Sequence, residues 1–79
     1  MSVFLSELKK GDKALIIKID NNIPFKIKRR LLELGFVENT KICLHSISIL
    51  GEVLLLELNG FLLSVRKNIA KHIQIKKVN

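Results

Sequence analysis

The sequence predicts a mainly β protein, a small closed β-barrel of five to six short strands. One amphipathic helix is expected after the first strand, and a short helical turn is expected before the last strand. Several short runs have apolar residues at every second position, the period of a β-strand, whereas a single run has helical spacing. A closed barrel is favoured because it leaves no exposed edges on such apolar strands.

Length and composition limit the chain to one small domain. Of its 79 residues, 48% are hydrophobic and 27% are charged, a balance typical of globular rather than disordered proteins. The length excludes a two-domain enzyme with an interdomain cleft, so we assign one domain to residues 1–79. Cys43 is the single cysteine and can form no internal disulfide, which indicates a reducing compartment.

The first twenty residues predict a helical turn followed by a strand. Leu5 and Leu8 are three residues apart, with Ser6 suited to cap the turn, and Gly11-Asp12 then reverses the chain. Residues 13–19 are rich in isoleucine and leucine, so we expect the first strand there, largely buried.

Residues 25–34 predict the amphipathic helix, about three turns long. Ile27, Leu31 and Leu34 recur at helical spacing and form an apolar stripe that we expect to face the core. Pro24 suits the first turn of this helix, and Gly35 suits the left-handed residue that ends it.

The second half of the chain has the period of strands. Alternation begins at Lys41, and after a turn at residues 50–52 a further strand is expected at residues 53–58. Asn59-Gly60 predicts a type I′ hairpin turn, because both residues tolerate a positive φ. It leads into a strand at residues 61–65.

A short helical turn over residues 66–72, with Asn68 as its cap, is expected before the last strand. That strand contains Ile73 and Ile75, which alternate with polar residues.

No catalytic motif is present in the chain. The four glycines are isolated turn residues rather than a phosphate-binding loop, and no hydrolase or kinase signature occurs. We therefore expect no enzymatic activity and no cofactor.

One pair of residues has some character of a metal site. Cys43 and His45 lie on the same face of the strand that begins at Lys41, two positions apart. A stable site needs three or four ligands, and thiolate with imidazole favours zinc or copper over ferrous iron. We expect Cys43 half-buried and His45 on the surface, with at most weak binding of a transition metal ion.

Basic residues give the chain a formal net charge of +7 and gather in two regions. Lys26, Lys28, Arg29 and Arg30 fall within five positions, and only basic charges follow Glu57. Such a potential attracts phosphates, acidic lipid head groups or an acidic protein surface, although it also serves solubility. Barrels that bind single strands stack bases on aromatic rings, but this chain has four phenylalanines, all expected in the core.

Turn and core residues of the chain, taken in order, resemble the FeoA family. The matching positions are Leu5-x-x-Leu8-x-x-Gly11, Ala14, Ile16, Arg30-Leu31-Leu32-Glu33-Leu34-Gly35, Thr40, Leu50-Gly51, Asn59-Gly60, Leu63-x-Val65-Arg66 and Ala70-x-x-Ile73. Two departures occur: Glu38-Asn39 replaces a Pro-Gly pair, and Val53 replaces a proline. Asn39 can adopt the left-handed conformation that the glycine would favour.

This resemblance implies an SH3-like barrel in the cytoplasm, without catalytic activity. It also implies a partner, the membrane ferrous-iron transporter FeoB, whose cytoplasmic region carries a GTPase domain. We expect recruitment to the inner face of the membrane by this partner and no direct membrane insertion. The alternative from the residues is a basic barrel that binds nucleic acid through its phosphates, and self-association stays open.

Docking needs an exposed surface rather than a cleft, and basic residues can steer and orient association. The residues that we expect to form the docking surface are Lys26, Arg29, Arg30, Leu50, Gly51 and Arg66. Among them Leu50 is an apolar residue expected at an exposed loop tip, a position typical of contact residues.

Overall fold

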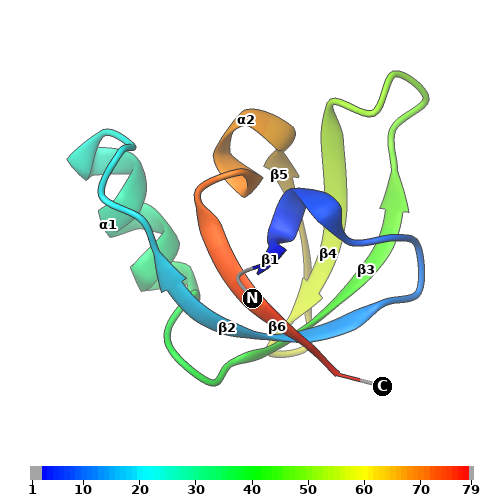
Figure 1. The fold of residues 1–79 in the computed structure, drawn as a ribbon, viewed down its shortest axis with the longest axis horizontal. Helices are drawn as coiled ribbons and strands as arrows, with labels where there is room; N and C mark the ends of the chain where they lie inside the picture. Colours follow the sequence, from blue (N-terminus) through cyan, green and yellow to red (C-terminus); the bar gives the residue numbers. More distant parts are fainter. Residues whose placement is uncertain (1–2, 79) are drawn as a thin grey trace.

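A single antiparallel sheet runs through the chain in the spatial order β1-β6-β2-β3-β4-β5 (Figure 1). The computed structural model describes residues 3–78, so Met1, Ser2 and Asn79 of the assigned domain lie outside the described residues. The strands are Val3–Phe4 (β1), Lys13–Ile19 (β2), Lys41–Ile47 (β3), Val53–Leu58 (β4), Phe61–Arg66 (β5) and Ile73–Val78 (β6). The helical elements are the 3₁₀ turn Leu5–Glu7 (η1), Phe25–Leu34 (α1) and Lys67–Ala70 (α2).

The mainly β architecture predicted from the sequence is confirmed. The helix follows the first predicted strand, now β2, and the short helix α2 precedes the last strand. The additional strand is β1, whose two residues pair with Ile75 and Gln74 of β6. Two residues are too few to show an alternating pattern, so the sequence gives no signal for β1.

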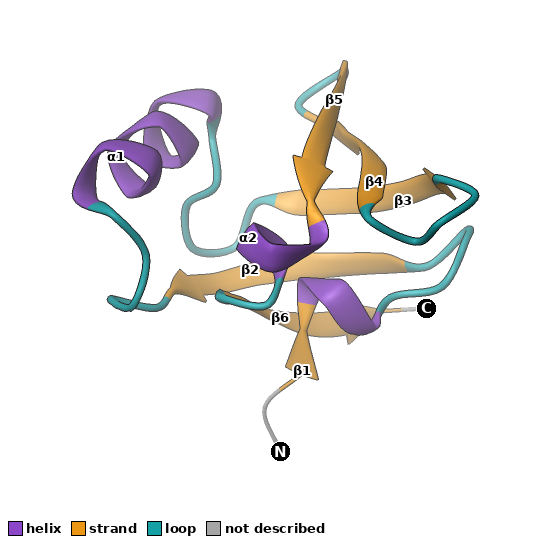
Figure 2. Ribbon diagram, turned by 90° about the horizontal axis from the view of Figure 1, so that it is seen from above, coloured by secondary structure: helices purple, strands orange, loops and turns teal. Residues whose placement is uncertain are grey.

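The barrel is completed by helical segments rather than by a ladder between its edge strands. Within residues 3–78, β1 and β5 lie at opposite ends of the hydrogen-bonded order and do not pair with each other. Helix α2 contacts both β5 and η1, and η1 contacts β6, so these segments cover the space between the sheet edges (Figure 2).

One apolar core lies inside the rolled sheet. Every strand except β1 contributes buried residues, and in β4 these are the alternating Leu54, Leu56 and Leu58. In β2 the alternation is interrupted, because the pairing with β6 shifts register between Ile16 and Lys18. This bulge allows both Ile16 and Ile19 to be buried, although they are an odd number of positions apart.

Helix α1 buries less of its surface than its apolar stripe predicts. Leu31 is buried and Ile27 is half-buried, but Leu34 is 43% exposed, so its assignment to the core is wrong. The helix stands beside the sheet and not across it (Figure 1). The contact between α1 and the rest of the barrel is therefore narrow. It buries Leu31 and leaves Leu34, at the end of the apolar stripe, in solvent.

The phenylalanines divide between core and surface. Phe36 is buried, as expected, whereas Phe4 is only half-buried and lies outside the core. The core assignments of the other two are wrong, because Phe25 is 75% exposed and Phe61 is 69% exposed. Phe25 opens α1 on the side away from Leu31, and Phe61 begins β5 directly after the hairpin turn, where the core ends.

Turn positions agree with the sequence, whereas two capping residues do not. Asn39 (φ 70°), Asn59 (φ 52°) and Gly35 (φ 110°) all adopt the left-handed conformations expected of them. The predicted cap Ser6 lies within η1, and the Glu7 carboxylate instead accepts the Phe4 N–H at 2.7 Å. Asn68 lies within α2, whose N-cap residue is Arg66.

Asp20 joins the end of β2 to the turn before β6. Its Oδ1 accepts the Asn22 N–H at 2.6 Å, its Oδ2 lies 3.2 Å from His72 Nδ1, and its own N–H donates to the His72 carbonyl at 2.7 Å. The Asn22 hydrogen bond, followed by the His72 contact, lowers the pKa of Asp20 below its ordinary value of 3.8. The ionised carboxylate is therefore favoured in the folded state.

We expect Asp20→Asn to make unfolding less sensitive to acid. A folded-state pKa below the unfolded value contributes stability above about pH 4, and this contribution is lost as the pH falls through the folded pKa. Thermal unfolding followed by circular dichroism from pH 6 to pH 2.5 should show the Tm difference between wild type and variant narrowing as the pH falls. Glu38→Gln is the control, since Glu38 is exposed and makes no ion pair within the described residues. A constant Tm difference at every pH would contradict this role of Asp20.

Candidate functional site

Three of the expected docking residues lie on α1. Lys26, Arg29 and Arg30 are all exposed. Arg29 Nε lies 3.8 Å from Glu33 Oε2, one helical turn away, and both side chains are well exposed. An exposed pair of this kind contributes little stability, so the Arg29 guanidinium can exchange Glu33 for an acidic group of a partner.

The other three expected docking residues lie at the β3–β4 loop and the end of β5. Leu50 and Gly51 form the loop tip, and Arg66 pairs with Val53 where β4 begins. Leu50 is 82% exposed, as expected for a contact residue. Neither the Arg30 nor the Arg66 side chain makes a hydrogen bond or ion pair with any residue in the range 3–78, so neither side chain ties down a turn.

The fold separates these two groups. Helix α1 stands on one side of the barrel and the β3–β4 loop projects from the other (Figure 1). Lys26, Arg29 and Arg30 therefore belong to one surface, and Leu50, Gly51 and Arg66 belong to another.

A shallow groove runs beside the basic residues of α1. It has a volume of about 410 Å³ and is lined by Asn21, Ile23, Phe25, Lys28, Arg29 and Leu32. Phe25 and Leu32 are seven residues apart, which places them on the same side of the helix two turns apart. Lys28 Nζ is held by Asn21 Oδ1 at 2.6 Å, so an ammonium group is fixed at the rim.

We call the exposed strip of Phe25 and Leu32, together with Lys26, Arg29 and Arg30, the α1 face. The sequence analysis identified the basic residues of this face but not its apolar ones. Their exposure could have been predicted from the helical spacing, because Phe25 and Leu32 lie outside the stripe formed by Ile27, Leu31 and Leu34. One helix cannot bury two separate apolar faces against a single sheet, so one of them had to meet solvent.

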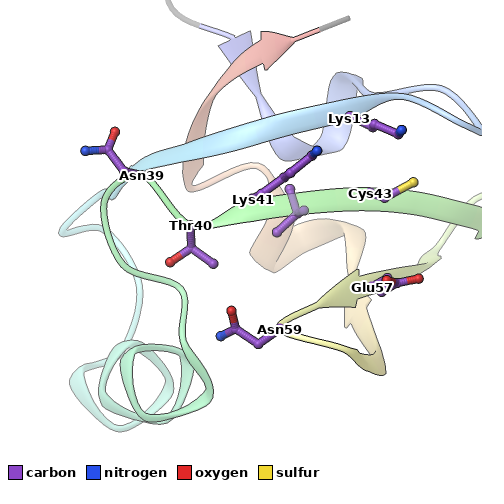
Figure 3. Close-up of a pocket in the computed structure, with 8 residues that line it drawn as sticks. Lys13, Asn39, Thr40, Lys41, Cys43, Glu57 and Asn59 are labelled. Carbon is purple, nitrogen blue, oxygen red and sulfur yellow. The ribbon is translucent and has the colours of Figure 1, made fainter.

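A wide hollow lies on the outer face of the sheet, across β2, β3 and β4 (Figure 3). It has a volume of about 650 Å³, with Cys43 and Glu57 at one end and Asn39, Thr40 and Asn59 at the other. Cys43 and Glu57 are directly paired across β3 and β4. The hollow is open and polar, and no described side chain within it is arranged as a nucleophile with its base.

His45 also binds Glu57, with its Nε2 2.8 Å from Glu57 Oε1. Cys43 is half-buried and His45 is exposed, as expected. Among residues 3–78, no group of three His, Cys, Asp or Glu side chains converges to hold a metal ion. The two-ligand pattern seen in the sequence is therefore not completed by a third residue of the fold.

The fold and its surface define a class of protein. A small SH3-like sheet with a helical insertion presents two exposed surfaces of apolar and basic residues, and its outer hollow holds no arranged catalytic group. No helix within the described part of the chain could span a bilayer. The class is therefore a small β-barrel domain with a helical insertion.

Comparison with known proteins gives the family. The FeoA domain model matches residues 3–77, and a Campylobacter jejuni protein described as an Fe(2+) transport protein A is 31% identical over 94% of this chain and 97% of its own. The chain belongs to the FeoA family. It is accordingly a non-enzymatic accessory protein of Fe(2+) transport, associated with the Feo iron-transport system.

Solved structures agree with this fold. The solution structure of FeoA from Chlorobium tepidum has a TM-score of 0.89 and 32% identity, covering 98% of this chain and 71% of that one. FeoA from Stenotrophomonas maltophilia in complex with zinc, described as a prokaryotic SH3 domain protein, has a TM-score of 0.83 and 28% identity, covering 94% and 89%. The SH3-like barrel expected from the family resemblance is confirmed.

Proposed function

We propose that this protein regulates ferrous-iron uptake by docking onto the cytoplasmic part of the FeoB-type transporter. Membership of the FeoA family supports a role in ferrous-iron uptake, and the C. jejuni relative is described as an Fe(2+) transport protein. The protein acts from the cytoplasm, at the inner face of the membrane where its partner lies. Docking changes transport by favouring one of the transporter's conformational states, to which the protein binds more tightly than to the others.

The α1 face is the docking surface, and its exposed Phe25–Leu32 strip is the observation that carries this assignment. Interfaces typically combine a desolvated apolar centre with a charged rim. Phe25 and Leu32 supply the centre, while Lys28 and Arg29 lie at the edge of the same groove. The complementary surface on the transporter carries an apolar side chain surrounded by carboxylates.

Charge reversal on the α1 face should weaken docking without unfolding the protein. We expect Arg29→Glu combined with Arg30→Glu to raise the Kd for the purified cytoplasmic region of the transporter about 10-fold, mainly through slower association. Both side chains are exposed, so the Tm should stay within a few degrees of wild type. Association and dissociation rates measured by biolayer interferometry, together with thermal unfolding, test this.

The matched control is Lys10→Glu combined with Lys76→Glu, which changes the net charge equally at exposed positions outside α1. This variant should dock like wild type at moderate salt. Equal weakening by both double variants would show that only overall charge matters. Failure of the wild-type protein to bind both the cytoplasmic region and the full-length transporter in membranes would refute the proposed function.

Nucleic-acid binding is the alternative that the net charge of +7 leaves open. Binding through phosphates alone weakens steeply as salt rises. The two exposed phenylalanines, Phe25 and Phe61, come from α1 and β5 and not from adjacent strands of one open face. Titration with duplex DNA at low and moderate salt separates the two functions, and sub-micromolar affinity that survives moderate salt would favour the alternative.

A further inference from the structure

The tip of the β3–β4 loop presents two consecutive aliphatic side chains to solvent. Ile49 is fully exposed and Leu50 is 82% exposed, which makes them the most exposed large apolar residues of the described chain. Scattered single apolar residues are normal on a surface. Two adjacent apolar side chains at the end of a projecting hairpin are different, because both can be buried at once in a lipid bilayer or in the surface of another protein (Figure 1).

This tip is held in one conformation by its own hydrogen bonds. Ser48 Oγ accepts the N–H groups of Glu52 at 3.1 Å and Val53 at 3.0 Å, and the Ser48 N–H donates to the Val53 carbonyl at 2.9 Å. The Gly51 N–H closes the turn on the Ser48 carbonyl at 2.8 Å. Ile49 and Leu50 are thus displayed on an ordered loop, so little conformational entropy is lost when they become buried.

Basic side chains stand at the base of the same loop. The Lys67 N–H donates to the Glu52 carbonyl at 2.8 Å, which fixes the start of α2 against the loop. Arg66, Lys67 and Lys71 line a hollow of about 300 Å³ together with Glu52 and Asn68. None of these three cations forms an ion pair with another residue in the range 3–78.

We propose that this loop is a membrane-contact site that binds the surface of an anionic bilayer. Ile49 and Leu50 enter the boundary between head groups and acyl chains, and Arg66, Lys67 and Lys71 bind the lipid phosphates above them. Apolar insertion and attraction of basic residues to anionic lipids are the two contributions that hold proteins at this interface. This shallow contact revises the expectation of no direct membrane insertion: two side chains enter the interface, although no helix of the described residues could span the bilayer.

The composition of the tip favours a lipid surface over a protein partner. Energetically important residues of protein interfaces are enriched in Trp, Tyr and Arg, whereas Leu is under-represented among them and Lys is depleted from interfaces. The site offers the aliphatic pair at the loop tip and two lysines beside a single arginine, Arg66, and no aromatic ring. A fluid bilayer requires no shape complementarity, so two aliphatic side chains with surrounding cations are sufficient.

Membrane contact through this loop is an interaction separate from docking onto the transporter, and it leaves the α1 face free. The two regions lie on opposite sides of the barrel (Figure 1). A molecule held at the bilayer by its loop can therefore present Phe25, Leu32 and Arg29 to a neighbouring membrane protein. The loop also increases the local concentration of the protein beside such a partner.

Co-sedimentation of the full chain with lipid vesicles tests the proposal. We expect wild type to bind vesicles of equal parts phosphatidylglycerol and phosphatidylcholine and to bind pure phosphatidylcholine far more weakly. Ile49→Ser combined with Leu50→Ser should lower the partition coefficient roughly 100-fold. Replacing Arg66, Lys67 and Lys71 by glutamine should lower it by a similar factor.

Phe25→Ser combined with Leu32→Ser is the control, since it also removes two exposed apolar side chains, from α1 and not from the loop, and should leave vesicle binding unchanged. Absence of wild-type binding to the phosphatidylglycerol vesicles, or equal binding by the Ile49/Leu50 variant, would overturn the proposal. A loss of transporter docking by that variant with vesicle binding intact would also overturn it, because the tip would then bind protein. Each result is independent of whether the α1 face docks.

Discussion

Phe25→Ser combined with Leu32→Ser should weaken docking to the transporter's cytoplasmic region about 100-fold. The two side chains form the apolar centre of the α1 face, and truncating buried centre residues costs interfaces far more than changing rim charges. Both are exposed in the free protein, so the fold should be retained. The Kd by isothermal titration calorimetry and the Tm of each variant measure the two effects separately.

The chain contains a closely matched control for this prediction. Phe61 and Leu62 on β5 are a second exposed Phe and Leu pair, with Phe61 69% exposed. Phe61→Ser combined with Leu62→Ser removes equivalent apolar surface from another element and should leave docking near the wild-type value. If the β5 variant loses docking and the α1 variant keeps it, the docking surface is on β5 and the α1 assignment is wrong.

The sequence predicts the basic half of the α1 face but not its apolar half. Lys26, Arg29 and Arg30 are conspicuous in the chain because charges so closely spaced must be solvated. Phe25 and Leu32 were not recognised as surface residues, since an apolar residue on a helix is normally predicted to lie in the core. Only the position of α1 relative to the sheet decides which of its two apolar sides is buried, and that is a tertiary property.

The fold was more predictable than the site because its signals are local. Asn59-Gly60 specifies its hairpin through backbone conformation alone, and the alternation in Val53–Leu58 directly identifies the buried leucines. The bulge between Ile16 and Lys18 could not be predicted, because it depends on the register with β6, more than fifty residues further along the chain. The separation of Leu50 from Arg29 likewise depends on the rolled shape of the whole sheet.

Gly35→Ala should destabilise the protein by about 2 to 3 kcal/mol, which corresponds to a Tm lower by roughly 10 to 20 °C in a domain of this size. Two independent effects contribute to this loss of stability, backbone strain and steric contact of the added Cβ. Gly35 has φ +110°, a conformation that alanine adopts only with strain. A Cβ at this position would also lie 2.5 Å from Asn59 Nδ2 and 3.1 Å from Leu58 Cδ2, so the Asn59 side chain would have to move and the contact between the end of α1 and the β4–β5 hairpin would be disturbed.

Two further variants separate these penalties. Gly11 has a similar φ of +89° but no atom within 4 Å of the position of a Cβ, so Gly11→Ala should show the backbone penalty alone, about 1 kcal/mol. Adding Asn59→Gly to Gly35→Ala removes the closest contacting side chain at a turn position that favours glycine, and should restore part of the lost Tm. Equal destabilisation by the two alanine substitutions, without recovery from Asn59→Gly, would show that α1 is not held closely against the hairpin. The groove beside Phe25 and Leu32 depends on where α1 stands, so docking of the rescued double variant then reports whether that placement is required for function.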